Sequence, residues 1–211
     1  MYAAPADAPV AAPLARDFFN RPTEDVAREL LGVRLLRTTA DGVCGGPIVE
    51  TEAYGGPEDL ASHARAGRTR RTTPMFGEVG HAYVYLVYGM HECLNVVAYS
   101  GREAGAVLIR AISVDVGVEQ ARRRRGRPTD PDWKLCSGPA RLCHGLAVDR
   151  SLDGHDLTLG EGLWLAEAPS GESGSEVAVG RRIGVDYAGP GHVERPWRFW
   201  LAGHPAVSPV K

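Results

Sequence analysis

Short β-prone runs recur along most of this sequence, and they constrain its fold more than any other feature. They lie at residues 33–38, 47–54, 82–88, 93–99 and 105–112, and again near 162–167, 177–184 and 196–202. Helical patterns are few by comparison. A chain with many strands and few helices is typical of the α+β class. The sequence therefore predicts an α+β fold with a mainly antiparallel sheet that is flanked by helices.

Three segments carry helix signals. Thr23 is a candidate N-cap for a short helix, and Gly32 suits the end of that helix. A second helix is expected at about 116–125, where a final run of arginines complements the helix dipole. Ser137 is the expected N-cap of a third helix, with Pro139 in its first turn.

The length of 211 residues fits one domain or two small ones. Residues 1–13 are rich in Ala and Pro and are predicted to form a disordered tail, followed by a single domain over 14–211. The stretch 169–176 is predicted to be a surface loop.

No run approaches the roughly 20 apolar residues that span a bilayer. No basic segment followed by an apolar one marks a secretory signal at the N-terminus, so a cytoplasmic protein is expected.

Cysteine and histidine spacing gives no sign of a disulfide framework or a metal site. The cysteines are Cys44, Cys93, Cys136 and Cys143, and none form a CxxC pair. Four such thiols fit a reducing cytoplasm. The seven histidines make no HExxH pattern or paired Cys/His spacing, and no phosphate-binding loop motif is present. We therefore expect neither a metal ion nor another cofactor.

Basic residues are clustered, although the net charge is only −2. Lys134 and Lys211 are the two lysines, which leaves 22 arginines among the 24 basic residues. One arginine cluster falls within 65–71 and another within 122–127. Local patches can bind phosphate even on a mildly acidic protein, because screening confines the field to about 10 Å. The alternative is an arginine-rich composition whose runs are solvated faces; the clustering is harder to attribute to composition.

The segment 50–76, ETEAYGGPEDLASHARAGRTRRTTPMF, carries the most informative set of polar side chains. In a strand, Glu50, Glu52 and Tyr54 alternate onto one face, and such a face does not suit a core. A buried glutamate beside an aromatic ring is a good general base, because desolvation raises its pKa toward the working pH. His63 and four arginines follow. On these residues alone, an exposed strand face with a locally packed His63 is the simpler interpretation.

The segment 82–97, AYVYLVYGMHECLNVV, predicts a strand, a turn and a second strand. Tyr88 falls at the tip beside Gly89, which permits a tight turn. An exposed aromatic tip can act as a wedge in a base stack, and aromatic faces on a neighbouring strand can enclose an extruded base. The alternative is that Tyr and Val are common in strands because they pack well there.

Together these segments resemble the alkyladenine (3-methyladenine) DNA glycosylase family of monofunctional base-excision enzymes. The resemblance runs from about residue 15 to residue 208. It is carried by IVETEAYGGPEDLASHA, YVYLVYGMHECLNVV, AVLIRA at 106–111, LCSGPARLCHGLAV at 135–148 and RFWLAGHPAVS near the C-terminus. It implies a single compact domain with a mainly antiparallel curved sheet and a protruding β-hairpin that inserts into DNA. The implied activity flips an alkylated or deaminated purine from the duplex and hydrolyses its N-glycosidic bond, leaving an abasic site.

The resemblance also implies catalytic roles. Glu52 matches the general base that deprotonates a water for attack at C1′ of the sugar, and Arg110 matches an arginine near that base. Alkylation at N3 or N7 makes the purine a cation and a good leaving group, so little acid assistance is needed. General-base catalysis typically supplies a factor of ~10²–10⁴. Electrostatics and orientation supply the rest.

The implied base pocket contains Tyr54, His63 and Tyr85, which match residues that enclose the flipped base. Asn95 matches an asparagine at the pocket floor that helps to reject guanine through its amino group. A cationic purine would gain from lying between electron-rich faces such as those of Tyr54 and Tyr85.

The implied DNA contacts lie at the hairpin and on the surrounding surface. Tyr88 matches the hairpin residue that fills the gap left in the duplex, with Met90 beside it. The other candidates for DNA contact are Arg65, Leu108, Ser137 and Gly138. The last two could hold a phosphate at a helix N-terminus, and ordinary capping is an equal alternative. His91 departs from the family, whose better-known members carry an aromatic residue there, and this puts the grip of the tip and the favoured lesions in doubt.

Lysine is too scarce to favour strand cleavage. A glycosylase that also cleaves the strand needs an amine for a Schiff base, and only Lys134, Lys211 and the N-terminus are available. Simple hydrolysis is therefore predicted. The expected partner is double-stranded DNA containing a damaged purine, with no membrane, and the expected state is a monomer associated with the nucleoid.

Two other functions stay open at this stage. A non-catalytic nucleic-acid-binding module would keep the basic patches and Tyr88 but would need no carboxylate at a pocket. An enzyme acting on a free nucleoside would need neither a protruding Tyr88 nor flanking arginines. The sequence does not rank 3-methyladenine, 7-methylguanine, hypoxanthine and ethenoadenine as substrates.

Overall fold

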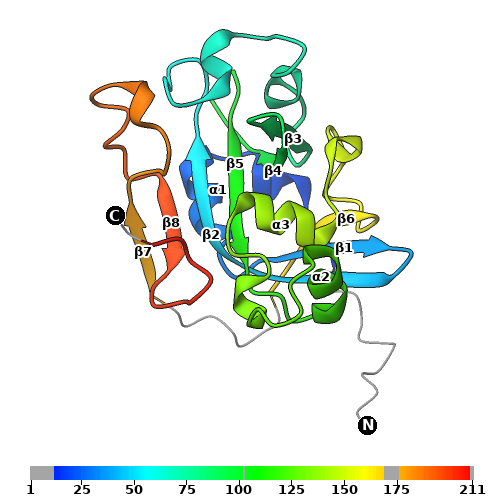
Figure 1. Ribbon diagram of the computed structural model, residues 1–211. Helices are drawn as coiled ribbons and strands as arrows, with labels where there is room; N and C mark the ends of the chain where they lie inside the picture. Colours follow the sequence, from blue (N-terminus) through cyan, green and yellow to red (C-terminus); the bar gives the residue numbers. More distant parts are fainter. Residues whose placement is uncertain (1–11, 102, 169–175, 210–211) are drawn as a thin grey trace.

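The computed structural model describes residues 12–101, 103–168 and 176–209, which form an antiparallel sheet with three α-helices (Figure 1). The strands are β1 (Arg34–Thr39), β2 (Gly42–Tyr54), β3 (Ala82–Val87), β4 (His91–Val97), β5 (Ala106–Ile112), β6 (Leu163–Ala166), β7 (Val177–Gly180) and β8 (Arg198–Leu201). The helices are α1 (Thr23–Glu29), α2 (Val118–Arg125) and α3 (Pro139–Leu146). Every pairing between these strands is antiparallel, which confirms the predicted α+β class.

The long strand β2 joins the two parts of the sheet. Its first half pairs with β1, and its second half pairs with β5 on one side and β8 on the other. The main strand order is β3-β4-β5-β2-β1-β6, and β7 lies beyond β8. The register shifts on either side of Glu50, so the half that carries Glu52 is offset from the regular ladder.

The sequence predicted the start of β2 at residue 47, five residues too late. The missed part contains Gly45 and Gly46, which are weak strand formers. A Cβ on Gly45 would lie 2.1 Å from the carbonyl oxygen of Leu35, and one on Gly46 would lie 1.9 Å from that of Ser113. Glycine is therefore required here by the close approach of neighbouring backbones, a requirement that is invisible in the β-propensity of the segment.

The helices cover both faces of the sheet. Helix α1 packs against β2, β5 and β8, whereas α3 packs against β4 and β5 and carries α2 beside it. In Figure 1, α3 crosses in front of the sheet and α1 lies behind it. One hydrophobic cluster includes residues from both sides, among them Val26, Leu30, Ile109, Leu142 and Leu146. The flanking position predicted for the helices is confirmed.

Both predicted side-chain N-caps are wrong. Helix α1 begins after Pro22, and the buried hydroxyl of Thr23 donates instead to the carbonyl oxygen of Ala98 at 2.8 Å. Helix α3 begins after Gly138, and the hydroxyl of Ser137 donates to the carbonyl oxygen of Lys134 at 3.1 Å. The N-cap positions are instead occupied by Pro22 and Gly138, neither of which makes a side-chain cap hydrogen bond.

The remaining predicted boundaries differ by a few residues. The strand expected at 177–184 ends at Gly180, because residues 181–185 turn back toward β2 to make side-chain and backbone contacts described below. The predicted tail lies outside the described residues except for Ala12 and Pro13, and Pro13 forms a β-bridge with Ala166. The predicted loop 169–176 lies outside them except for Glu176. None of the helices in the described ranges is long and apolar enough to cross a membrane.

Candidate active site beside the β3–β4 hairpin

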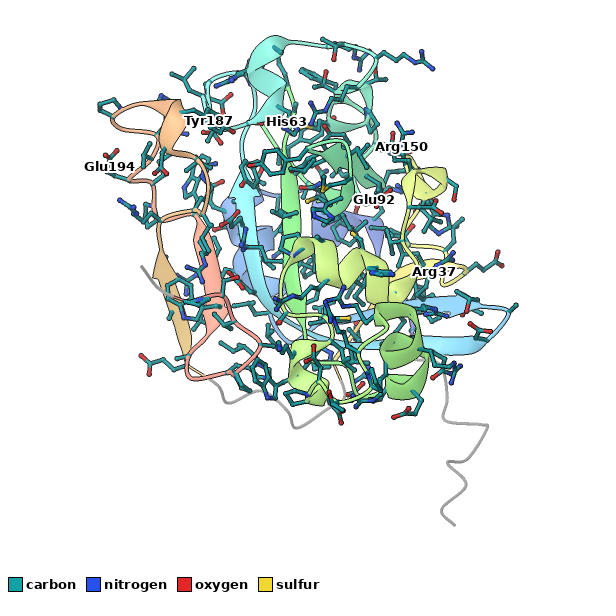
Figure 2. All side chains as sticks on the ribbon, in the orientation of Figure 1. Arg37, His63, Glu92, Arg150, Tyr187 and Glu194 are labelled. Carbon is teal, nitrogen blue, oxygen red and sulfur yellow. The ribbon has the colours of Figure 1, made fainter. Side chains whose placement is uncertain are left out.

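A cavity of about 380 Å³ opens at the end of the sheet that carries the β3–β4 hairpin. This volume is within the range of small-molecule sites. Figure 2 shows two of its lining residues, His63 and Tyr187, at the same end of the molecule although they are far apart in sequence. The predicted site residues that line it are Tyr54, His63, Tyr85, Tyr88, Asn95, Leu108 and Arg110. The fold thus gathers most of the candidate residues around one opening.

Glu52 is fully buried and does not itself line this cavity, but its side-chain partners do. Its Oε2 accepts a hydrogen bond from the hydroxyl of Tyr54 at 2.8 Å and lies 3.1 Å from Nη1 of Arg110. Its Oε1 accepts from the backbone N–H of Ile183 at 2.7 Å. These three partners line the cavity wall, so they fix the carboxylate at its edge.

Glu50 lies two residues earlier on the same strand face, but it belongs to a different network. Its Oε1 accepts from Nε of Arg110 at 2.8 Å and from Nε of Arg198 at 2.7 Å. Its Oε2 accepts from the backbone N–H and the hydroxyl of Ser208. Glu50 is therefore saturated. Neither carboxylate lines the cavity itself, but all three partners of Glu52 do, whereas Arg110 is the one partner of Glu50 that does.

Arg110 joins these two carboxylates from the adjacent strand β5. Burial by itself would lower its pKa, but the negative charges of Glu52 and Glu50 outweigh that effect and raise the pKa of Arg110. The guanidinium is thus permanently charged. Burial also raises the pKa of the Tyr54 phenol, reinforced by the charge of Glu52, so Tyr54 stays protonated and donates to that carboxylate.

An aromatic cluster forms one wall of the cavity. Nδ1 of His63 lies 3.0 Å from the hydroxyl of Tyr83, and the His63 ring meets that of Tyr85 edge to face, with centroids 4.6 Å apart. Burial lowers the pKa of His63 to about 4, with Arg71 and Arg65 adding to the effect. His63 is therefore neutral at neutral pH, and the wall is aromatic.

Asn95 lies on β4 at the buried end of the cavity and is 3% exposed. Its Nδ2 donates to the carbonyl oxygen of Tyr83 at 3.0 Å, across the β3–β4 pair. Leu108, its register partner on β5, is also buried and lines the cavity. Leu108 was predicted as a neighbour at the pocket or at the DNA contact, and it lies at the cavity.

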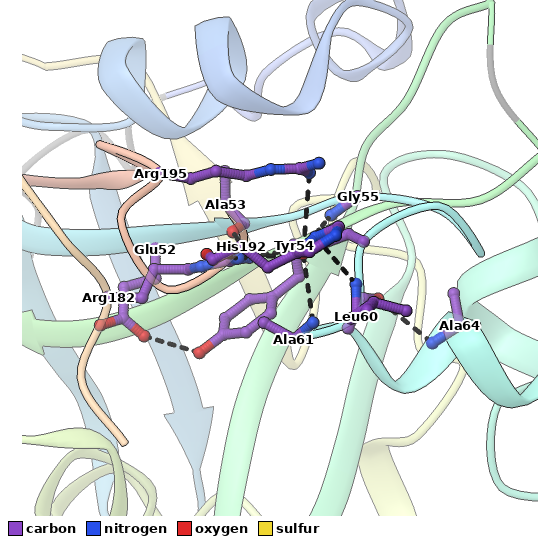
Figure 3. Close-up of polar contacts among 12 residues, drawn as sticks. Glu52, Ala53, Tyr54, Gly55, Leu60, Ala61, Ala64, Arg182, His192 and Arg195 are labelled. Carbon is purple, nitrogen blue, oxygen red and sulfur yellow. Dashed lines mark hydrogen bonds and ion pairs between the residues drawn. The ribbon is translucent and has the colours of Figure 1, made fainter. Parts of the chain in front are cut away.

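The ion pair between Arg182 and Asp59 was missed by sequence reasoning, which assigned residue 182 to a strand. Both side chains are fully buried, with Nη1–Oδ2 at 2.5 Å and Nη2–Oδ1 at 2.9 Å. Arg182 also donates to the carbonyl oxygen of Ala53. Figure 3 shows this network around Tyr54. It holds the next residue, Ile183, against Glu52. Asp59 and Arg182 are over 120 residues apart, so no local spacing pattern could reveal them.

Two further lining residues, Arg71 and Tyr187, were also missed as site residues. The guanidinium of Arg71 lies 5.2 Å from the ring centroid of Tyr85. Tyr187 donates its hydroxyl to the carbonyl oxygen of Ala61, and the guanidinium of Arg65 lies 4.9 Å from its ring centroid. Arg65 itself is exposed and does not line the cavity, so it lies beside the opening.

The hairpin tip is a three-residue turn that projects Tyr88 from the rim of the cavity. Tyr88 has a φ of 52° and Gly89 a φ of 72°, and the N–H of Met90 donates to the carbonyl oxygen of Val87. Tyr88 is 89% exposed and Met90 68% exposed. His91 is the first residue of β4 and is exposed as well. An exposed tyrosine in the left-handed region is uncommon, and such strain is concentrated at functional positions.

The two arginine clusters have different surroundings. Arginines 65, 68, 70 and 71 are all exposed near the cavity. In α2, Arg122 pairs with Glu119 and Asp132, and Arg124 contacts Thr39, Asp41 and the carbonyl oxygen of Gly145. The second cluster is thus largely engaged in holding α2 to its neighbours. Ser137 and Gly138 border a separate surface groove and do not meet the cavity.

Potential metal ligands do not gather at this site. Within the described residues, no three His, Cys, Asp or Glu side chains come together as a metal-binding group. The groups that the described residues place at this site are the carboxylate of Glu52, the guanidinium of Arg110 and the aromatic side chains of the cavity wall. A buried carboxylate at the edge of an aromatic cavity can accept a proton from a water directed at a bound planar substrate.

Comparison with known proteins supports this interpretation. A model of the methylpurine-DNA glycosylase family matches residues 17–205. A Streptomyces avermitilis protein, provisionally named a 3-methyladenine DNA glycosylase, is 46% identical over 97% of this chain and 94% of its own length. The DNA-3-methyladenine glycosylases of Mus musculus and Homo sapiens are 45% and 40% identical, over 93% of this chain and over 61% and 68% of those proteins. The chain therefore belongs to the methylpurine-DNA glycosylase family.

Proposed function

We propose that this protein is a base-excision repair glycosylase that takes alkylated or deaminated purines out of duplex DNA and hydrolyses their N-glycosidic bond. The observation that carries the proposal is the position of Glu52, a fully buried carboxylate held by three donors at the edge of an aromatic cavity. A binding module would gain nothing from burying that charge, because an ion is costly to remove from water.

Glu52 is the proposed general base. Oε2 already has two partners, whereas Oε1 has the single N–H of Ile183 and retains a free lone pair for a water. As the C1′–N bond breaks, its electron pair leaves with the purine, the water oxygen bonds to C1′, and Glu52 accepts the proton of the water. Arg110 is the proposed positioning partner that keeps Oε2 from turning away. The negative carboxylate also favours the positive charge that develops on the sugar.

The cavity is the proposed receptor for the flipped base. Tyr54, His63 and Tyr85 would contact its faces or edges, and Asn95, whose Nδ2 is used by Tyr83, would turn Oδ1 toward its polar edge. Base–aromatic stacking is worth about 1–3 kcal/mol per base, which is comparable to the cost of unstacking a damaged base.

Tyr88 and Met90 are the proposed wedge that enters the duplex. Both are exposed on the same turn, and Tyr88 lines the cavity, so the tip could fill the gap while the base occupies the cavity. Arg65 and its exposed neighbours are the proposed phosphate contacts on that side. Ser137 and Gly138 border a groove away from the cavity, so any phosphate contact there would belong to the flanking duplex.

Hydrolysis without strand cleavage is the proposed outcome. A Schiff-base mechanism needs an amine at the cavity, and no lysine lines it in the described ranges. Lys134 lies elsewhere, 3.1 Å from Asp130, and Lys211 lies outside the described residues. We further propose that the enzyme acts as a monomer in the cytoplasm, near the nucleoid. Its four buried free thiols suit that reducing compartment.

The test is excision from a duplex oligonucleotide with a single hypoxanthine or ethenoadenine, followed by alkali to cut abasic sites. Wild type should give alkali-dependent cleavage, and Glu52→Gln should reduce the single-turnover rate by roughly 10²-fold or more. Glu50→Gln is the control, because Glu50 contacts the same arginine but has both oxygens filled by Arg110, Arg198 and Ser208 and none left for a water.

Three outcomes would decide between the candidate functions. Loss of activity with retained DNA binding in Glu52→Gln would support the glycosylase and exclude a binding module. Cleavage without alkali would contradict simple hydrolysis. No release by wild type from these duplexes or from methylated genomic DNA would overturn the enzymatic proposal.

A further inference from the structure

The positive charges at the cavity are unevenly balanced. Arg110 and Arg182 are each ion-paired with buried carboxylates. Arg71 also lines the cavity, and among the described residues no carboxylate forms an ion pair with it. Its recorded contacts are with aromatic rings and His63. A base that enters the cavity therefore meets one guanidinium whose charge is not neutralised locally.

The histidine beside Arg71 does not change this balance. Nη2 of Arg71 lies 3.5 Å from Nε2 of His63. Burial, followed by the charges of Arg71 and Arg65, lowers the pKa of His63 to about 4. His63 is uncharged at neutral pH, so of these positive charges that of Arg71 is the one that lines the cavity at this wall.

The two rings expected to hold a cationic purine already carry guanidinium groups. Arg182 lies 4.9 Å from the centroid of the Tyr54 ring, and Arg71 lies 5.2 Å from that of Tyr85. A cation is attracted to the electron-rich face of such a ring. At Tyr85 the charge of Arg71, which has no ion-pair partner among the described residues, weakens that attraction for a second cation, whereas Asp59 offsets the charge of Arg182 at Tyr54. The cavity is thus less suited to a cationic base than its aromatic composition suggests.

We propose that Arg71 determines specificity at this site, favouring purine lesions that are uncharged and offer a hydrogen-bond acceptor over purines made cationic by methylation. The proposal rests on the glycosylase function proposed above. When the bond from C1′ to an uncharged purine breaks, the electron pair leaves the base negative, and a nearby guanidinium stabilises that charge. A cationic purine leaves uncharged, so Arg71 gives no such help and repels the base beforehand.

Arg68 provides a matched control. It belongs to the same exposed arginine cluster, and its guanidinium also lies over an aromatic ring, 5.7 Å from the centroid of Phe76. It donates to the carbonyl oxygen of Phe76 and does not line the cavity. Replacing either arginine removes one exposed positive charge from the same loop, so a general loss of DNA affinity would affect both variants alike.

The experiment measures single-turnover excision at saturating enzyme from duplexes with one hypoxanthine or one 7-methylguanine. The readout is the ratio of the two rates within each protein, for wild type, Arg71→Gln, Arg71→Lys and Arg68→Gln. This ratio cancels any common effect on folding or DNA affinity. In Arg71→Gln the ratio of hypoxanthine to 7-methylguanine excision should fall roughly tenfold, the effect of one partly screened charge near the base. Arg71→Lys should keep most of the ratio, and Arg68→Gln all of it.

An unchanged ratio in Arg71→Gln would overturn the proposal, as would an equal change in Arg68→Gln. Excision of neither lesion by wild type would instead count against the glycosylase function itself, so the two failures are distinguishable.

Discussion

Burial is the main reason why the His63 side chain is uncharged at neutral pH. Its ring contacts Tyr83, Tyr85 and the guanidinium of Arg71, and within the described part of the chain no carboxylate forms an ion pair with it. Desolvation therefore lowers the pKa of His63 from 6.5 to about 4, and Arg71 and Arg65 reinforce the shift. Burial likewise raises the pKa of Tyr83 to about 12. Both partners are neutral over the range in which the enzyme would work.

This shift predicts a pH-dependent stability. Between pH 6.5 and about pH 4 the unfolded chain binds a proton at His63 that the folded chain does not. Stability contributed by the neutral ring is therefore present above pH 6.5 and is lost as pH falls toward 4. His63→Gln should flatten the fall in the free energy of unfolding across this window, as measured by urea denaturation at several pH values. Equal slopes for wild type and variant would contradict the assignment.

At the scale of elements, β2 depends on backbones that approach too closely for any side chain. Gly45 and Gly46 lie where β2 passes β1 and the segment after β5. The same strand then carries the register shift at Glu50 and ends with Glu52 at the cavity. The glycine pair thus places the catalytic candidate by letting the strand pass between its neighbours.

Replacing Gly46 tests this dependence. In Gly46→Ala the new Cβ would meet the Ser113 carbonyl oxygen at 1.9 Å, which the backbone must move to relieve. We expect a loss of about 3 kcal/mol in the free energy of unfolding, at the upper end of overpacking effects. Gly203→Ala is the control: its φ is 73° but no atom lies within 4 Å of the new Cβ. Its loss should stay near 1 kcal/mol. Equal losses would contradict close approach as the reason for glycine at position 46, because the φ of Gly46 is not in the left-handed region.

Across the whole molecule, the two arginine clusters differ in their surroundings. Those at 65–71 are exposed beside the cavity, whereas several in α2 are bound to neighbouring segments. The protein can therefore be mildly acidic overall and still offer a positive surface where the hairpin projects. Arginine that already has protein partners contributes little to counterion release on binding.

Salt dependence of DNA binding distinguishes the two clusters. Arg70→Gln should reduce the slope of log Kobs against log salt by roughly one unit, since the slope counts phosphate contacts. Arg124→Gln should leave the slope unchanged and lower stability instead, because Arg124 holds Thr39 and the end of α3. Binding of a lesion-free duplex, titrated at several salt concentrations, measures the slope. A reduced slope in Arg124→Gln alone would reverse the assignment.

From the sequence alone came the α+β class, the flanking helices, and the positions of most strands. The candidate residues Glu52, Tyr54, Tyr85 and Asn95 came from the family resemblance of the local motifs that contain them, and strand alternation alone did not assign their roles. Local pattern could not supply the hydrogen-bond partners of Thr23 and Ser137. The acceptor of Thr23, the carbonyl oxygen of Ala98, is 75 residues away, whereas that of Ser137 belongs to a local turn that the helix prediction did not include.

The contacts between residues far apart in the sequence were determined by the tertiary structure. It separated Glu50 from Glu52 by giving the former Arg198 and Ser208 as partners, although the sequence places both carboxylates on one face. It also brought Arg182 to Asp59 and Ile183 to Glu52. Alternation along a strand determines which side chains share a face, because that depends on backbone geometry alone. The hydrogen-bond partners of each buried carboxylate, and its position relative to the cavity, depend on the groups that distant segments of the chain pack against it.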